Sequence, residues 1–376
     1  MNNSVLWLWL CAKVKREKQI LLLESFKSIE NIYSASLSDY TELEFLKPDE
    51  INLLVNKDLS DAKAEYHRLS DYGIYTLTID EPEYPEVLKH IFSPPALLYC
   101  KGKFVNMNKH LCLAMVGTRK ATAYGKSCSE NLARELSKRG VVVVSGLAMG
   151  IDTKAHEGAL KGNTPTVAIV GCGLDITYPA SNRGLMEKIT ETGMVISEYP
   201  LGTPPEKYHF PERNRIIAGV TQGTIVVEAD IKSGSLITVK HAVESGREVF
   251  AIPGNINSPY SRGTNFLLRD GAKIALSAEE VLYSFIYDYK DRLLDASKHE
   301  EPEYSEIKEN NLPLPDNRKP EEKILGVLKD GPANADKICA ITSLDIGCVN
   351  SSLLMMEIKG LVIKGAGGFY ELKSSF

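Results

Sequence analysis

The chain has 376 residues, of which 43% are hydrophobic, and its formal net charge is −5. This length predicts two or three domains, and the acidic total excludes a protein coated in positive charge without excluding a local basic pocket. The seven cysteines form no C-x-x-C pair and the seven histidines show no metal-ligand spacing, so we expect free thiols in a cytoplasmic protein, without a metal site or disulfides.

Residues 1–72 are predicted to form a small domain of several short helices that ends near Gly73. Their apolar positions recur in four stretches, at 5–10, 20–26, 43–46 and 51–55. The run Val5–Cys11 has no basic residues before it and is too short to cross a bilayer, so we expect neither a signal peptide nor membrane insertion. Residues 74–110, with four prolines, look like an extended lead-in with one short helix.

Residues 111–276 alternate continuous apolar runs with helical patterns. The predicted strands are 111–116, 141–144, 166–170, 194–197, 224–228 and 248–252. The helical patterns lie at 122–139, 151–161, 181–192, 212–219 and 234–246. This alternation predicts a parallel sheet covered on both faces, which is an α/β fold. Ligands of such sheets bind in the loops at the carboxyl ends of the strands.

Glycines and polar residues follow these strands, where a ligand would bind. Gly117, Gly146 and Gly150 permit close approach of the backbone, and the amides of the helices that follow can point at phosphate. The hydroxyls of Ser145 and Ser235 add donors, and Arg119 can form a charge-assisted fork to a phosphate. Each glycine taken alone also fits an ordinary turn between a strand and a helix.

The segment Phe210–Arg215 (FPERNR) brings an aromatic ring and two arginines within six residues. Pro211 biases Phe210 toward an extended backbone. A projecting ring beside two guanidiniums suits a base face and its phosphates. The alternative is a turn with a buried phenylalanine and a solvated helix N-terminus.

Two nucleotide-binding motifs are near misses. Gly125-Lys-Ser127 resembles the end of a phosphate loop, but Lys120 stands where the first glycine is required. Gly171-Cys-Gly173 lacks the third glycine of a dinucleotide fingerprint. We therefore expect neither an ATPase nor a dinucleotide enzyme, and no cofactor.

The C-terminal part is predicted to form a linker and a winged helix. Residues 296–316 are acidic, rich in proline and poor in apolar residues, which is typical of a flexible linker after a sheet domain at 73–295. Residues 317–376 show three helical patterns and a final hairpin. The third helix, near 346–358, has no Lys or Arg, which favours protein contact over DNA reading.

Several motifs together resemble the DNA processing protein A (DprA/Smf) family over nearly the whole chain. They are Val116–Arg119, Ser145–Asp152, Phe210–Arg215, Val227–Glu228 with Ser233–Ser235, and Ala251–Gly254. The resemblance implies an extended Rossmann-like domain that binds single-stranded DNA and loads the RecA recombinase onto incoming strands during natural transformation, without catalysis. Family members often carry a sterile-alpha-like or helix-hairpin-helix module at the N-terminus. Here Ala12–Arg16 stands where such hairpins carry glycines, so we expect a packing or protein-contact role for it.

The resemblance also assigns roles to individual residues. Those implied to hold the single strand are Arg119, Lys207, Phe210, Arg213, Asn214 and Arg215, and those lining the same pocket are Ser145, Gly146, Ser233, Gly234 and Ser235. Two departures are conservative, because Thr118 replaces a usual serine and His209 precedes Phe210. The family forms two-fold dimers through the segment 263–276, which would place Phe266, Leu267 and Ile274 at the interface; alternatively these three residues fill the core.

An enzymatic alternative is a nucleoside-monophosphate phosphoribohydrolase on a related fold. Such enzymes have a similar first loop and a glutamate near a glycine-rich loop, a place that Glu228 would take. They use a Pro-Gly-Gly-x-Gly-Thr signature with the acid after it, whereas Glu228 precedes its turn. We therefore expect Glu228 to cap or buttress a neighbouring loop, and the protein not to be an enzyme.

Overall fold

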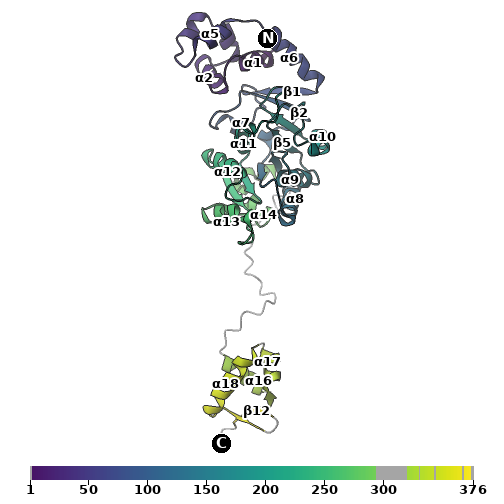
Figure 1. Ribbon diagram of the computed structural model, residues 1–376, viewed down its shortest axis with the longest axis vertical. Coiled ribbons are helices and arrows are strands. Elements are labelled where there is room, and N and C mark those ends of the chain that lie inside the picture. Colours follow the sequence, from purple (N-terminus) through teal and green to yellow (C-terminus); the bar gives the residue numbers. More distant parts are fainter. Residues whose placement is uncertain (1, 294–319, 330, 343, 366–367, 374–376) are drawn as a thin grey trace. The chain divides into compact units, whose positions relative to one another are not determined.

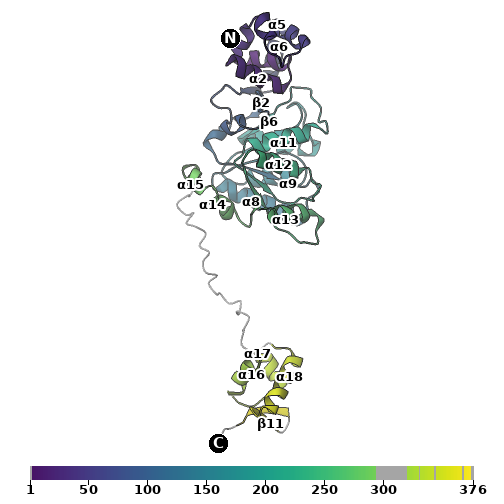
Figure 2. The same cartoon turned by 90° about the vertical axis from the view of Figure 1, so that its left-hand side faces the viewer.

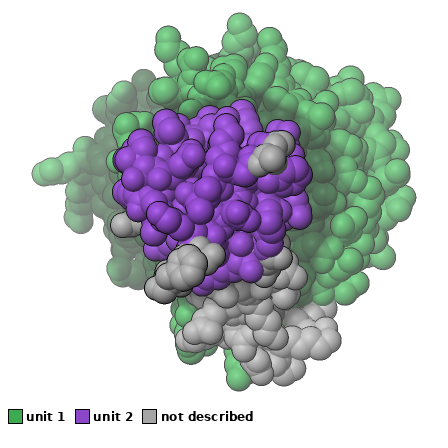
Figure 3. Space-filling view, turned by 90° about the horizontal axis from the view of Figure 1, so that it is seen from below, with its two compact units in different colours: residues 1–302 green, residues 303–376 purple. Residues whose placement is uncertain are grey.

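The computed structural model describes residues 2–293, 320–329, 331–342, 344–365 and 368–373 (Figure 1). The chain forms two compact units, residues 1–302 and 303–376 (Figure 3). The first is built around two hydrophobic clusters and the second around another. The predicted acidic linker, 296–316, lies outside the described residues.

The first unit begins with six helices. They are α1 (Asn3–Cys11), α2 (Arg16–Phe26), α3 (Ile29–Ser34), α4 (Leu37–Thr41), α5 (Pro48–Val55) and α6 (Ser60–Asp71). The apolar run that might suggest a signal is α1, whose Trp7 and Trp9 are fully buried. Their ring nitrogens donate to the Asp80 carboxylate at 2.8 Å and to the Asn56 carbonyl at 3.1 Å. This helix is therefore the centre of a local core.

Nine strands form one sheet in the order β1-β2-β6-β5-β4-β3-β7-β8-β9. Their bounds are β1 Ile74–Thr78, β2 Leu97–Gly102, β3 Cys112–Val116, β4 Val142–Ser145, β5 Thr166–Val170, β6 Met194–Ser197, β7 Gly223–Val226, β8 Glu248–Ala251 and β9 Lys273–Ile274. All neighbours from β6 to β9 are parallel, as predicted, and β1 and β2 are antiparallel additions. Those two strands lie in the segment 74–110, for which the sequence predicted only an extended lead-in and a helix.

Helices cover both faces of this sheet. They are α7 (Glu86–Lys89), α8 (Ala123–Lys138), α9 (Ile151–Ala159), α10 (Arg183–Thr192), α11 (His209–Gly219), α12 (Ser235–Glu244), α13 (Arg262–Arg269), α14 (Ala278–Tyr283) and α15 (Ile286–Tyr289), with 3₁₀ turns at Met107–Lys109, Ala180–Asn182, Pro259–Ser261 and Lys290–Arg292. Figure 1 shows α8 and α9 on one side of the strands and α11 and α12 on the other. The α/β prediction is confirmed.

Alternate residues of the central strands enter two different cores. Along β3, Leu113 and Met115 pack in the cluster that includes α8 and α9, whereas Cys112 and Ala114 pack in the larger cluster. This is the period-two alternation of a strand that is buried on both faces. The larger cluster continues into the N-terminal helices (Figure 2), of which α1 and α6 pack on β1 and α1 also on β2. The helical region and the sheet thus share one core across the predicted boundary at residue 72.

The order of the strands reverses at β3. From β3 the chain adds β4, β5 and β6 on one side, and then crosses over to add β7, β8 and β9 on the other. The loops after β3 and its neighbours therefore diverge, and they leave a crevice at the carboxyl edge, where ligands of doubly wound sheets bind.

The second unit has a winged-helix architecture. Three helices, α16 (Pro320–Lys329), α17 (Ala335–Thr342) and α18 (Ile346–Ile358), pack on an antiparallel sheet of β10 (Ala333–Asn334), β12 (Phe369–Leu372) and β11 (Val362–Lys364). Within the described segments, no single helix is long and apolar enough to cross a membrane. The pair α17 and α18, bent by 116°, meets the length and composition test only when the two are taken together.

Candidate nucleic-acid interface

A cavity of about 750 Å³ lies at the carboxyl edge of the sheet. Its wall combines the loops after β3, β4, β5 and β6, the N-terminal parts of α9, α11 and α12, and the loop before α12. The residues from these segments that bear charge, rings or hydroxyls are Thr118, Arg119, Asp152, Tyr178, Glu206, Lys207, Phe210, Arg213, Asn214, Ser233, Ser235 and Thr238. Most of the residues singled out from the sequence therefore meet at one place.

Glu228 holds the loop that carries Arg119. Its carboxylate accepts hydrogen bonds from the backbone and the hydroxyl of Thr122, at 2.9 and 2.5 Å, and its carbonyl accepts one from the amide of Thr118 at 2.8 Å. Thr122 is the N-cap of α8. A side chain at Gly125 would meet the Glu228 carboxylate at 2.2 Å, so this packing requires glycine. The expectation that Glu228 buttresses a neighbouring loop is confirmed.

Arg119 reaches over the cavity from that loop. Its guanidinium carbon lies 4.9 Å from the centre of the Phe210 ring, a cation–π distance. Across the part of the chain that the structure describes, neither Arg119 nor Lys207 forms an ion pair. Both residues line the cavity, so their positive charge is available to a ligand.

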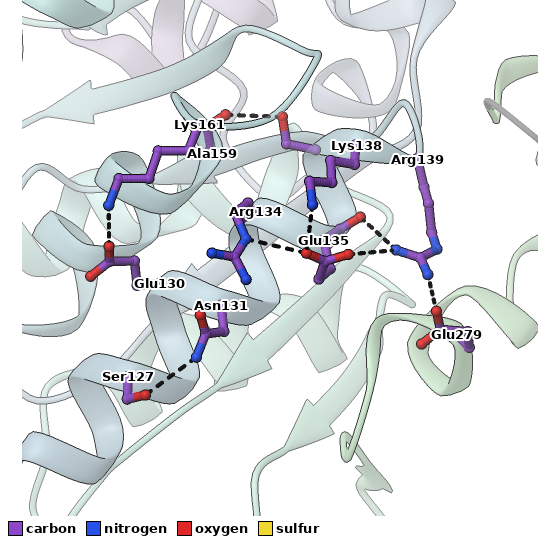
Figure 4. Close-up of polar contacts among 11 residues, drawn as sticks. Ser127, Glu130, Asn131, Arg134, Glu135, Lys138, Arg139, Ala159, Lys161 and Glu279 are labelled. Carbon is purple, nitrogen blue, oxygen red and sulfur yellow. Dashed lines mark hydrogen bonds and ion pairs between the residues drawn. The ribbon is translucent and has the colours of Figure 1, made fainter.

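Several basic side chains elsewhere on this unit form ion pairs with acidic neighbours. Along α8, Figure 4 shows Arg134 and Lys138 directed at Glu135, with N–O distances of 3.2 and 3.0 Å. In the same view Lys161 pairs with Glu130, and Arg139 bridges Glu135 and Glu279. These cations are neutralised by neighbours, whereas Arg119 and Lys207 have no ion-pair partner within the described part of the chain.

Arg213 is buried behind the cavity and holds the loop after β4. Its guanidinium donates to the carbonyls of Gly146, at 2.8 Å, and Ile169. Asp152 accepts from the amides of Gly146 and Ala148 at 3.1 and 3.4 Å. A side chain at Gly146 would meet both the Arg213 guanidinium and the Asp152 carboxylate at 2.7 Å. This glycine is thus needed for packing, and it does not itself line the cavity.

Burial dominates the electrostatics of Asp152 and Arg213. It raises the pKa of Asp152 from 3.8 to about 6, although Arg213 and the two amides oppose the shift. Burial also lowers the pKa of Arg213 to about 10, against the attraction of Asp152. Burying these two charged groups costs desolvation energy, and their hydrogen bonds to the backbone fix the loop after β4 against α11.

Phe210 lies in the first turn of α11, not in an extended segment as Pro211 suggested. The helix begins at His209, so Pro211 falls in the first turn, where its missing amide has no intrahelical partner to lose. The Phe210 ring faces the cavity, with the ring of Tyr178 at 5.4 Å between centres. Asn214 reaches the carbonyl of Gly234 at 3.5 Å, and the hydroxyls of Ser233 and Ser235, on either side of that glycine, lie 2.8 Å apart.

Two predicted site residues are used internally. Arg215 is absent from the cavity wall, and its guanidinium pairs with both oxygens of Glu198 at 2.5 and 2.6 Å. Its side chain is only 8% exposed, and Glu198 also pairs with Arg16 of α2 at 2.7 Å. Ser145 is fully buried and donates to the carbonyl of Met115 at 2.6 Å. We therefore assign both residues structural roles in place of the expected contacts with phosphate.

Sequence reasoning missed Tyr178, which lines the cavity and is 41% exposed. It lies several residues beyond the strand β5, on a loop with no periodic pattern, and only the fold brings it to Phe210. Asp152 was noted within a motif but not as a wall residue. Its position two residues after Gly150, at the start of a helix, was the available signal for an amide-binding carboxylate.

The three residues predicted at a dimer interface divide into two groups. Phe266 and Ile274 are 41% and 39% exposed, and Leu276 beside them is 68% exposed. Leu267 is partly buried and packs against the core, as the alternative prediction had it. We call Phe266, Ile274 and Leu276 the edge patch, because β9 is the last strand of the sheet.

The fold and this cavity define a class: a Rossmann-like protein with a cationic and aromatic ligand site at the reversal of its strand order. The family model of the DNA recombination-mediator protein A matches residues 75–286, and that of the DprA winged helix domain matches residues 308–368. The chain belongs to the DNA recombination-mediator protein A family, as its motifs indicated.

Individual relatives agree over most of the chain. Protein Smf of Synechocystis sp. is 37% identical over 318 residues, which are 78% of this chain and 79% of that protein. DNA processing protein DprA of Bacillus subtilis is 43% identical over 211 residues, 56% of this chain and 71% of that one. The solved DprA of Streptococcus pneumoniae has a TM-score of 0.68 at 34% identity, covering 76% of this chain and 98% of that one.

A second solved relative bears on the ligand. The DNA processing protein A of Helicobacter pylori, studied for its single-stranded DNA binding mode, has a TM-score of 0.53 at 34% identity and covers 57% of this chain and 97% of that one. Family membership makes this chain a DNA recombination mediator of a non-enzymatic family. The phosphoribohydrolase alternative is therefore set aside.

Proposed function

We propose that this protein binds single-stranded DNA in the cavity at the carboxyl edge of its sheet. The observation that carries the proposal is the pair of Arg119 and Phe210, a cation without an acidic partner among the described residues and an aromatic ring in one wall. Single strands expose both phosphates and base faces, and proteins that bind them combine a positive groove with stacking rings. The relative from H. pylori supports the choice of ligand.

Within this site Arg119 and Lys207 neutralise phosphates, and Phe210 contacts a base. Asn214 and the hydroxyls of Ser233 and Ser235 also line the cavity and offer hydrogen bonds. Gly117 and Gly234 also line the cavity, and a side chain at Gly117 would meet Ile151 at 2.6 Å and the carbonyl of Glu228 at 2.8 Å. The loop after β3 thus follows a path open only to glycine at position 117.

The test is a salt titration of binding to a labelled single-stranded oligonucleotide, followed by fluorescence anisotropy. Arg119→Ala should bind more weakly than the wild type, and its slope of log affinity against log salt should fall by about 0.7. Arg134→Ala, which removes an arginine already paired on α8, is the matched control and should behave as the wild type. Identical titrations for Arg119→Ala and the wild type, or equal affinity for a duplex, would reject the proposal.

We further propose that the protein protects incoming single strands and loads RecA onto them during natural transformation. Family membership supports a mediator role, since a mediator must pass its strand to a recombinase. The expected result is faster RecA-dependent strand exchange on strands first covered by this protein, with Arg119→Ala giving less acceleration. A cytoplasmic location follows from the same role. No acceleration by the wild type would contradict the RecA proposal and leave DNA binding intact.

A homodimer formed through the edge patch is also proposed. A two-fold contact needs one self-complementary surface, and β9 presents an unpaired strand edge beside exposed apolar side chains. Two cavities held together would raise the effective concentration along one strand. Ile274→Lys should give a folded monomer that binds DNA more weakly, whereas Leu37→Lys, at a 57% exposed leucine of α4, should stay dimeric. Light scattering that finds a wild-type monomer at micromolar concentration would exclude the dimer.

The modular division stays part of the proposal. Residues 1–72 contribute packing or protein contact, 73–295 bind DNA, and 317–376 form a separate contact module beyond the linker at 296–316. The second unit supports this role, because α18 carries no Lys or Arg and exposes Leu354 (58%) and Ile358 (71%).

A further inference from the structure

The cavity contains an aromatic side chain that the proposed function does not yet use. Tyr178 lies in the cavity wall and is 41% exposed, and its ring centre is 5.4 Å from that of Phe210, with the two planes inclined by 33°. Such a spacing is that of an aromatic pair in direct contact. The two rings therefore form one continuous aromatic surface, which we call the ring pair.

A base cannot enter between the two rings as they stand. Optimal contact between carbon atoms is about 3.5–4.0 Å, so a base held between two rings would need their centres about 7–8 Å apart. The observed 5.4 Å is too short. Phe210 is also covered by Arg119, at 4.9 Å from the ring centre. A base that contacts Phe210 must therefore displace either the guanidinium or Tyr178, whereas the exposed surface of Tyr178 needs no such displacement.

The loop that carries Tyr178 is anchored on both sides. Before it, the Asp175 carboxylate accepts from the amide of Gly202 at 3.0 Å. After it, the Asn182 amide donates to the carbonyl of Leu147 at 2.9 Å and to the hydroxyl of Thr153 at 3.0 Å. Ordering such a loop on binding would cost free energy, and here the internal hydrogen bonds have already fixed it. Tyr178 is thus held in place at the cavity before any ligand arrives.

We propose that Tyr178 is a base-stacking residue of the single-strand site, and that it extends the aromatic surface of Phe210 to a neighbouring base. This inference rests on the proposed function, because it names the part of the ligand that Tyr178 recognises. Its consequence is that the affinity of the cavity for a strand depends on the bases as well as on the phosphates. Strands of equal charge but without bases at the site lose the Tyr178 contribution.

The experiment compares two oligonucleotides of the same length and charge, one intact and one with a central run of abasic sites. Affinities are measured by anisotropy for the wild type, Tyr178→Ala, Tyr178→Leu, Tyr178→Phe and the control Tyr72→Ala, a tyrosine of matched exposure (46%) after α6. Loss of a stacking ring should weaken binding of the intact strand by about tenfold in the Ala and Leu variants. Tyr178→Phe and Tyr72→Ala should stay within twofold of the wild type.

On the abasic strand all five proteins should bind within about twofold of one another, and the salt slope on the intact strand should be the same for each, because Tyr178 contacts no phosphate. A loss of equal size on both strands would show that Tyr178 only supports the fold, and it would overturn the inference. So would intact-strand binding by both Tyr178→Ala and Tyr178→Leu that equals the wild type. A wild type that does not prefer single strands would instead overturn the proposed function, and this inference with it.

Discussion

Two hollows of similar size in the first unit differ in the charge they leave uncompensated. The cavity at the carboxyl edge measures about 750 Å³, and a cleft between the N-terminal helices, the strand β2 and the loop after β6 measures about 710 Å³. The ionisable residues of the cavity are three basic and two acidic: Arg119, Lys207, Arg213, Asp152 and Glu206. Those of the cleft are three basic and four acidic: Lys13, Lys15, Arg16, Asp58, Asp61, Glu65 and Glu198.

The difference lies in the partners of the arginines. In the cleft Arg16 pairs with Glu198, which also neutralises Arg215 behind the wall. At the cavity Arg119 lies over an aromatic ring and, within the described residues, has no carboxylate in an ion pair. Volume therefore does not distinguish the two hollows, because they are of similar size. What distinguishes the cavity is an arginine that has no ion pair among the described residues and lies at the edge where ligands of such sheets bind.

The largest expected effect is the loss of stability when the carboxylate that neutralises the arginines at the cleft is removed. Glu198→Ala leaves the buried Arg215 guanidinium without its ion-pair partner, and removal of one member of a buried pair costs about 3–5 kcal/mol. Urea denaturation should show this loss. Glu244→Ala, whose pair with Lys240 is exposed, should cost less than about 1 kcal/mol. Equal midpoints for the Glu198 and Glu244 variants would contradict this account of the cleft.

The next largest effect is the pH dependence of stability that Asp152, in the cavity wall, contributes. The pKa of Asp152 is about 6 in the fold against 3.8 when unfolded, so the folded state binds the extra proton. Stability from this group is therefore greatest below about pH 4 and declines as the pH rises through 6, by about 2 kcal/mol between pH 4.5 and 7.5.

Asp152→Asn removes this titration while keeping an oxygen for the amides of Gly146 and Ala148. The difference between its unfolding free energy and that of the wild type should change by about 2 kcal/mol over the same pH range. His156, one turn further along α9, has its pKa lowered by burial to about 3, and its contribution is common to both proteins, so it cancels in their difference. A constant difference between the two proteins from pH 4.5 to 7.5 would show that burial does not raise the pKa of Asp152.

A smaller effect compares one lysine from each hollow. Lys207 and Lys15 are both exposed, and within the described chain neither has an ion pair. Lys207→Ala should weaken single-strand binding roughly fivefold and lower the salt slope by about 0.7, since it removes one phosphate contact. Lys15→Ala should change neither, because the cleft around it is acidic. If both variants lose affinity alike, the strand also runs across the cleft, and the comparison between the two hollows fails.

The smallest effect is expected from deleting residues 317–376. The second unit has its own core, and α18 offers no cation to a phosphate. The truncated protein should bind single strands within about twofold of the full chain in a gel shift. Circular dichroism should confirm that the first unit remains folded. A loss of more than tenfold in the folded truncation would assign DNA contact to the winged helix.

The sequence by itself determined the α/β class, the central parallel strands and the edge at which the loops meet. Strands that are buried on both faces are continuous apolar runs, which can be recognised in a sequence, and the carboxyl ends of parallel strands share one edge. The supporting role of Glu228 was also predictable, since an acid before a turn at a strand end lies within reach of neighbouring amides. The antiparallel strands β1 and β2 were not, because their segment is broken by prolines and shows no clear period.

Only the tertiary structure decided the roles of similar side chains. Arg213 and Arg215 lie two positions apart on α11, so a helix of 3.6 residues per turn directs them to different sides. One then meets the loop after β4, and the other meets Glu198 and, through it, Arg16 of α2. Tyr178 joins Phe210 in the same way, through a loop distant in sequence. Periodicity records whether a side chain is buried, but its partner depends on which distant segments the fold brings together.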